Sequence, residues 1–363
     1  MATLLAGGAQ AADLKVTTLT VIPKPDAEQP FPRDVIEMPF ITHDRPELAA
    51  NINDRLFIAR FKALAPVKAE PRLPADEFDL AGLAGQTFKV SRNDARLLTI
   101  QFNAEGCGAY CETYSVAYSF DTQTGRLLQP QDLFTRAGVQ ALAVRMRKEK
   151  QRLYREQIAQ RKKELKTARK QKAESETIDD LEERIAFNSE CLAGQEGDAD
   201  DALVKTFIDE RWEFKAEDAR WTSERCSNHA SRALDDVGNV SLSLPYASLR
   251  PHLTAYGKSV LLGEGKPVAG GVSGQVLRGR LGKQPVVMVL EKQSDNSVSG
   301  VYFYEKYRKP IELGGQEEGG KFDLEERDAD GNPVARLQLE VGKNGLRGEW
   351  QGKQSLPMEL RAP

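Results

Sequence analysis

The sequence predicts an α+β N-terminal domain with an inserted long, charged helical hairpin, followed by an all-β up-and-down barrel of about eight strands. Three observations support this fold class. The 363 residues exceed one ordinary domain. Sparse apolar residues at helical spacing run through 137–192, and short alternating segments recur after residue 275. The predicted boundaries are 13–258 for the first domain, 259–274 for a linker and 275–363 for the barrel.

Residues 1–12 are predicted to be the remnant of a signal peptide. Ala9-Gln10-Ala11 has the small-x-small form of a cleavage site. The apolar stretch before it is short and has no basic residue, so we expect the true start to lie upstream. No later stretch reaches the roughly 20 apolar residues of a membrane span. We therefore expect a periplasmic or secreted protein without a transmembrane segment.

The chain has four cysteines, which an exported protein is expected to join in two disulfides. Four cysteines allow three pairings, and the favoured one joins Cys107 to Cys111 and Cys191 to Cys226. A redox-active pair is the alternative at Cys107 and Cys111. It is disfavoured because such pairs usually occur as Cys-x-x-Cys at the start of a helix. The spacings do not match a zinc site, so no metal ligands are predicted.

The N-terminal domain is expected to begin with extended segments over 13–41 and a helix over 46–64. Pro46 suits a first helical turn. A Pro/Ala loop over 65–86 is followed by strands that alternate through Phe102 and again through Phe120. The aromatic face of the last strand is interpreted as core rather than as a binding platform.

The predicted hairpin has two arms of opposite charge. Residues 145–172 carry 13 basic and 3 acidic residues, whereas 174–201 carry 11 acidic and 1 basic. The turn is expected at 175–177, and an antiparallel arrangement would pair the two arms. The alternative, a basic arm that binds an anionic polymer, is disfavoured by the adjacent acidic arm. Because the overall charge is only -3, we also expect no nucleic-acid partner.

The rest of the chain divides into an irregular segment and a run of strands. Residues 202–236 are expected to be helical and irregular, and 240–244 to form a strand. From residue 276 onward, alternating segments are separated by turn signals such as Asn344-Gly345 and Asp330-Gly331. Regular spacing of this kind is typical of a meander closed into a barrel.

Several segments of the first domain carry a family resemblance. They are Met38-Pro39-Phe40-Ile41, Asn51-Ile52-Asn53, Phe120-Asp121-Thr122-Gln123-Thr124-Gly125, Asp132-Leu133-Phe134 and Leu244-Pro245-Tyr246. In order and spacing they resemble the secreted α/β domain of lysozyme-sensing anti-sigma factors and of peptidoglycan deacetylase N-termini. The charged hairpin departs from that pattern. The resemblance implies a peptidoglycan fragment or a lysozyme-like hydrolase as partner. The last 100 residues resemble a small calycin-like β-barrel, through Gly300–Tyr304 and Gly345–Trp350.

No catalytic residue is predicted, because the chain lacks a nucleophile elbow, a phosphate-binding loop and a zinc-protease motif. His43-Asp44 is interpreted as a capping or surface feature. Tyr302, Tyr304 and Trp350 are the candidate ligand-binding residues, since aromatic side chains can line a barrel mouth. Packing inside the barrel is the alternative for all three.

These observations predict an exported cell-envelope binding or sensing protein without a cofactor. Two alternatives stay open. One is an envelope enzyme with its site between the two domains. The other is a structural or interaction protein that uses the charged hairpin.

Overall fold

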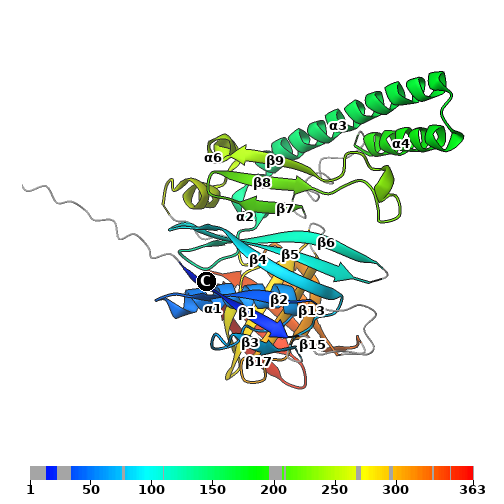
Figure 1. Cartoon of the computed structure of the whole chain (residues 1–363). Coiled ribbons are helices and arrows are strands. Elements are labelled where there is room, and N and C mark those ends of the chain that lie inside the picture. Colours follow the sequence, from blue (N-terminus) through cyan, green and yellow to red (C-terminus); the bar gives the residue numbers. More distant parts are fainter. Residues whose placement is uncertain are drawn as a thin grey trace, which may run out of the picture. The chain divides into compact units, whose positions relative to one another are not determined.

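The computed structural model describes residues 14–22, 34–75, 78–108, 110–195, 207, 210–266, 271–293, 297–328, 331–343 and 345–362. The chain forms two compact units (Figure 1). One combines Met1–Gln129 with Val268–Pro363, and the other is Pro130–Pro267. The barrel thus shares a unit with the first third of the chain. The predicted signal-peptide remnant, 1–12, lies outside the described residues.

The first unit begins with a six-stranded sheet of order β3-β1-β2-β4-β5-β6. Its strands are β1 (Lys15–Ile22), β2 (Ile36–Thr42), β3 (Arg72–Pro74), β4 (Leu83–Asn93), β5 (Leu97–Cys107) and β6 (Cys111–Asp121). In the β5–β6 hairpin, Ile100 lies opposite Tyr118 and Phe102 opposite Val116. These four side chains and Phe120 belong to or pack against one hydrophobic core, as the core interpretation of this strand predicts.

The C-terminal strands form a closed eight-stranded barrel in which each strand pairs antiparallel with the next and β10 pairs with β17. They are β10 (Leu277–Leu281), β11 (Gln284–Lys292), β12 (Ser297–Tyr304), β13 (Ile311–Glu318), β14 (Lys321–Arg327), β15 (Pro333–Gly342), β16 (Gly345–Gln351) and β17 (Ser355–Arg361). Alternate side chains such as Leu277, Met288 and Leu324 fill the interior, as expected for a barrel of this size. The predicted barrel is confirmed.

Helix α1 (Pro46–Phe61) packs between the sheet and the barrel wall. Ile52, Leu56 and Phe57 belong to the core beneath the sheet. Ile58 instead packs with outward-facing barrel residues that include Val287 and Phe303. Because the helix is covered on two sides, nearly every residue from Leu48 to Ile58 is buried, and the segment lacks the one-sided stripe of a surface helix.

Polar residues of α1 meet the barrel through a layer of hydrogen bonds and ion pairs. Arg55 donates to the Gly274 carbonyl at 2.8 Å and pairs with Glu291. Arg278 of β10 donates to Asn51 at 2.9 Å and pairs with Asp54. Buried charges are tolerated when they are paired and hydrogen-bonded, so this layer fixes the helix against the wall.

The second unit contains the predicted helical hairpin, α3 (Arg136–Gln171) and α4 (Ser175–Gly194), in green in Figure 1. Its other elements are α2 (Pro130–Leu133), β7 (Arg211–Phe214), β8 (Asp218–Ser223), η2 (Arg232–Leu234), β9 (Val240–Pro245), α6 (Tyr246–Leu249), η3 (Arg250–His252), α7 (Ala255–Gly257) and η4 (Lys258–Leu262). The hairpin prediction is confirmed. The turn lies at 172–174, three residues before the expected position, with Lys172 in the left-handed region (φ 54°).

The expectation that 202–236 is helical and irregular is wrong for two strands within the described part of this segment. Strands β7 and β8 lie within it and form a three-stranded sheet with β9. Trp212 and Trp221 lie opposite each other and stack with ring centroids 5.3 Å apart. Both pack against the fully buried Phe207, so a cluster of large aromatic side chains forms the core of these short strands.

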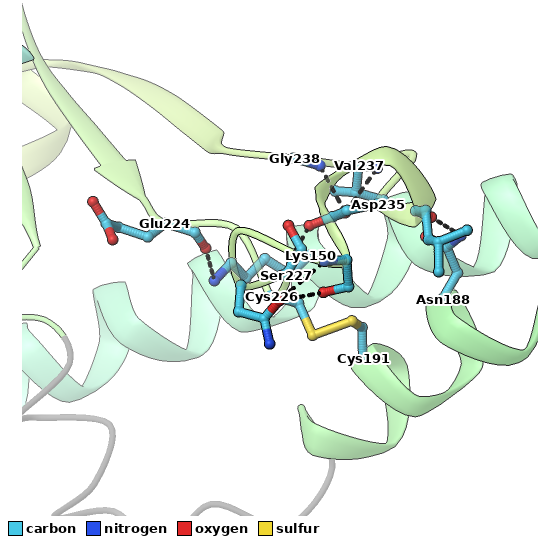
Figure 2. The surroundings of a disulfide bond; sticks show 12 residues. Lys150, Asn188, Cys191, Glu224, Cys226, Ser227, Asp235, Val237 and Gly238 are labelled. Atoms are coloured by element: carbon cyan, nitrogen blue, oxygen red, sulfur yellow. Dashed lines mark hydrogen bonds between the residues drawn. A yellow bond between two sulfur atoms is a disulfide. The ribbon is translucent and has the colours of Figure 1, made fainter. Parts of the chain in front are cut away.

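Both predicted disulfides are present. Cys107–Cys111 closes the β5–β6 hairpin, and Cys191–Cys226 ties α4 to the segment after β8. Figure 2 shows the second disulfide, with Lys150 of α3 donating to the Glu224 carbonyl at 2.9 Å beside it.

The two charged arms are joined partly by direct pairing and partly through a third segment. Arg169 of α3 pairs with Glu182 of α4. Asp236, which follows η2, is bound by Arg161 of α3 at 2.7 Å and by Arg184 of α4 at 3.1 Å. The buried Asp236 carboxylate therefore connects both arms to this loop.

Within the described residues, no helix combines the length and apolar character needed to cross a bilayer.

We expect Gly348→Ala to destabilise the barrel by about 2 kcal/mol or more, because a Cβ there would lie 1.9 Å from the Gln338 carbonyl oxygen. Gly314→Ala is the matched control on another strand, where a Cβ meets nothing within 4 Å. Urea unfolding of both variants measures the difference. Equal midpoints would show that the β15–β16 contact tolerates a methyl group.

We expect Asp236→Asn to lower the free energy of unfolding by about 2 kcal/mol at pH 7, since hydrogen bonds to charged groups contribute on this scale. Burial alone would raise the pKa of Asp236, but Arg161 and Arg184 hold it below its ordinary value of 3.8. The stability from this depressed pKa is complete above pH 3.8 and is lost as the pH falls through the folded-state value.

The difference between wild type and Asp236→Asn should therefore shrink when unfolding is measured at successively lower pH below 3.8. Asp180→Asn removes an exposed partner of the same Arg184 and should change stability little at any pH. A pH-independent difference for Asp236→Asn would contradict the ion-pair explanation.

Candidate functional site

A cleft of about 1120 Å³ opens in the first unit, between the start of α1, the turn after β6 and the outer surface of the barrel. Its lining residues are Asp44, Arg45, Pro46, Glu47, Leu48, Asn51, Gln123, Thr124, Val276, Arg278, Gly279, Arg280, Glu305, Glu359, Arg361 and Ala362. It is larger than a typical small-ligand pocket. Four arginines and four carboxylates dominate its lining.

The turn after β6 is held by its own hydrogen bonds and lies close to the start of α1. The Asp121 carboxylate accepts from the Gln123 N–H and the Thr124 hydroxyl at 2.8 and 3.0 Å. Gly125 has a positive φ of 79°, and a Cβ there would meet the Leu48 carbonyl oxygen at 3.0 Å. The Phe-Asp-x-x-Thr-Gly string in the sequence is therefore a turn that must approach the helix closely.

Arg45 links the same turn to the helix start. Its guanidinium donates to the Gln123 and Thr122 carbonyls at 2.6 and 2.8 Å. Its backbone N–H donates to Nδ1 of His43 at 3.0 Å, a local contact just before the helix, whereas no side chain caps the first turn of α1. The two acceptors of the Arg45 guanidinium in these contacts are neutral carbonyls. They do not neutralise its positive charge, which can therefore attract an anionic group at the rim of the cleft.

Asn51-Ile52-Asn53 connects α1 to two different elements. Asn53 forms a pair of hydrogen bonds with the backbone of Ile41 in β2, at 2.8 and 2.9 Å. Asn51 accepts from Arg278 of the barrel. The two asparagines thus hold the helix to the sheet on one side and to the cleft wall on the other.

Arg278 and Arg361 lie directly opposite each other on β10 and β17. Like charges in such a pair are unfavourable. Arg278 is compensated by Asp54, and its guanidinium is 3.7 Å from Glu305. The Arg361 and Arg280 side chains form no hydrogen bond or ion pair with any described residue.

Close packing of the two strands brings these arginines together. At Gly279, a Cβ would lie 1.8 Å from the Glu359 carbonyl oxygen, so only glycine allows this approach. Glu359 lies opposite Arg280 in the strand register, without an ion pair between them. The floor of the cleft therefore presents both cationic and anionic side chains, which could pair with the negative and positive groups of one ligand.

The residues that line the cleft include no His, Cys or Ser among those described. Among the described lining residues, Thr124 carries a hydroxyl group, which donates to the Asp121 carboxylate at 3.0 Å. The charged side chains of the lining are arginines and carboxylates.

The three predicted ligand-binding residues lie together at one end of the barrel interior. The Tyr302 and Tyr304 rings are 5.7 Å apart. The Tyr302 hydroxyl and the Trp350 indole N–H both donate to Oε2 of Glu326, at 2.8 and 2.9 Å. Tyr302 is fully buried, whereas Tyr304, Trp350 and Glu326 are partly exposed. Glu326 was not among the predicted ligand-binding residues, although it continues the interior alternation of Phe322 and Leu324.

Among the described residues, one group combines metal-ligating residue types, namely Glu105 with Cys107 and Cys111. Because the two sulfur atoms are joined in a disulfide, neither is available as a thiolate ligand.

The chain matches no protein-family model and no curated protein. Among solved structures, it is similar to a member of the DUF3298 family from Bacteroides fragilis NCTC 9343, with 14% identity and a TM-score of 0.42. That similarity covers 70% of this chain and 100% of the other. The resemblance to anti-sigma factor and deacetylase domains stays a prediction.

Proposed function

We propose that this protein is an exported binding module of the cell envelope, and that its cleft binds a ligand carrying both carboxylate and ammonium groups, such as a peptidoglycan fragment. The observation that carries the proposal is the pair of opposed arginines, Arg278 and Arg361, of which Arg361 lacks an anionic partner among the described residues. A bound carboxylate would relieve that like-charge contact, since Arg forms strong bidentate bonds with carboxylates.

Mixed charge favours a peptide-bearing ligand over a uniform polyanion. Asp44, Glu47 and Glu305 line the same cleft as the arginines, so a polymer of negative charges would be repelled by part of the lining. A short peptide attached to a glycan presents both charges on a small scaffold. The cleft volume of about 1120 Å³ is sufficient for several residues.

The disulfides support export. All four cysteines are paired, and such bonds persist mainly in oxidising compartments. A lysozyme-like hydrolase is the other partner implied by the sequence. The concave, mixed-charge lining favours the smaller ligand, because a protein partner needs an interface of about 800 Å² per side.

We expect the full chain to bind a peptide-bearing muropeptide and not the same glycan without its peptide, as measured by isothermal titration calorimetry. Arg361→Gln and Arg280→Gln should each weaken binding about tenfold, which corresponds to one charged hydrogen bond of about 1.4 kcal/mol. The muropeptide should be recovered chemically unchanged.

Arg347→Gln is the matched control, because this exposed arginine lies on the neighbouring strand β16, outside the cleft, and pairs with Glu340. Unchanged affinity in both cleft variants, or equal binding of the peptide-free glycan, would reject the cleft as the site. Lysozyme titrated in a separate arm tests the protein partner.

A further inference from the structure

The barrel interior holds a carboxylate whose charge no described side chain neutralises. Glu326 faces inward near the end of β14, and its Oε2 accepts two hydrogen bonds from neutral donors, Tyr302 and Trp350. No Lys or Arg among the described residues forms an ion pair with it. The nearest arginine along the strand, Arg327, pairs with the outward-facing Glu325.

A second inward-facing carboxylate of the barrel, Glu317, does have a cationic partner. Glu317, at the opposite end of the barrel, is paired with Lys292 and accepts from the Gly320 N–H at 2.6 Å. The hydrogen bond from Lys292 holds the pKa of Glu317 below its ordinary value. Glu326 is instead a partly exposed, inward-facing carboxylate that is held by neutral donors and has no cationic partner among the described residues, so it is the position at which a cation could be bound.

Further aromatic rings lie near the tyrosine that binds this carboxylate. Tyr304 lies beside Tyr302, and the exposed Tyr307 lies 6.2 Å from Tyr304 in an edge-to-face arrangement. Lys306 already places its ammonium 5.2 Å from the centre of the Tyr307 ring. Rings of this kind attract cations through their negative faces.

We propose that this end of the barrel is a binding site for an organic ammonium group, with Glu326 as its counter-ion and Tyr304 and Trp350 as its aromatic walls. The ligand class is a primary amine or a quaternary ammonium ion. The site is separate from the cleft in residues and chemistry, because the cleft is lined by outward-facing groups of β10 and β17.

The tyrosine beneath Glu326 stays protonated and holds one carboxylate oxygen in place. Burial first, and the adjacent Glu326 second, raise the pKa of the Tyr302 hydroxyl far above its ordinary value. Tyr302 therefore stays a neutral donor that orients Oε2. The other oxygen of Glu326 is left for the ligand.

The test uses the full-length chain and the indole N–H signal of Trp350 in a two-dimensional NMR spectrum, assigned by its loss in Trp350→Phe. Choline and butylamine are titrated in separate arms, and 3,3-dimethylbutanol serves as the uncharged analogue of choline. We expect saturable shifts with choline, butylamine or both, and none with the alcohol. A response to only one ammonium ligand identifies which form the site accepts.

Glu326→Gln keeps a hydrogen-bond acceptor for Tyr302 and Trp350 while removing the charge, so it is expected to fold and to weaken ammonium binding at least tenfold. Glu349→Gln removes an outward-facing carboxylate next to Trp350 and should bind as the wild type does. Circular dichroism verifies the fold of each variant. The proposal is overturned if no shift occurs up to about 10 mM ligand, if the alcohol binds equally, or if folded Glu326→Gln retains full affinity.

Discussion

The burial of α1 on two sides is the constraint on which the rest of the first unit depends. A helix between a sheet and a barrel wall must bury its polar side chains as well as its apolar ones, and those polar groups need partners. Asn53 finds them in β2, whereas Asn51 and Asp54 find them in Arg278 of the barrel. The barrel is therefore joined to the sheet by specific polar contacts in addition to apolar packing.

The cleft is a consequence of that attachment. Arg278 must point from β10 toward α1 to satisfy Asp54, and the strand register then places Arg361 directly opposite it. The Thr-Gly turn approaches the helix start and closes another side. The contacts that hold the helix thus bring several arginines to the cleft. Arg278 is used to bind Asp54, whereas Arg361 has no anionic partner among the described residues, which is why we propose a charged ligand there.

Much of the fold could be predicted because its signals are local. Period-two alternation with turn residues identified the barrel, and helical spacing identified the hairpin. Strands β7 and β8 were missed because they are short and their aromatic residues pack with each other and with Phe207 and Phe134, which lie outside these strands. The cleft could not be predicted, since Arg45 and Arg361 lie more than 300 residues apart in the sequence and meet only through the attachment of α1 to the barrel.

Glu326 shows how strand alternation can place a charged side chain inside a barrel. In a barrel strand the same period that places Leu324 in the core places the residue two positions later inside as well. A carboxylate at such a position costs free energy unless something compensates it. The chain compensates Glu317 with its own lysine, but it gives Glu326 only two neutral donors. The two proposed sites therefore use separate side chains of the barrel, because inward and outward residues alternate along each strand. A substitution at an inward position such as Glu326 leaves the outward residues of the cleft in place.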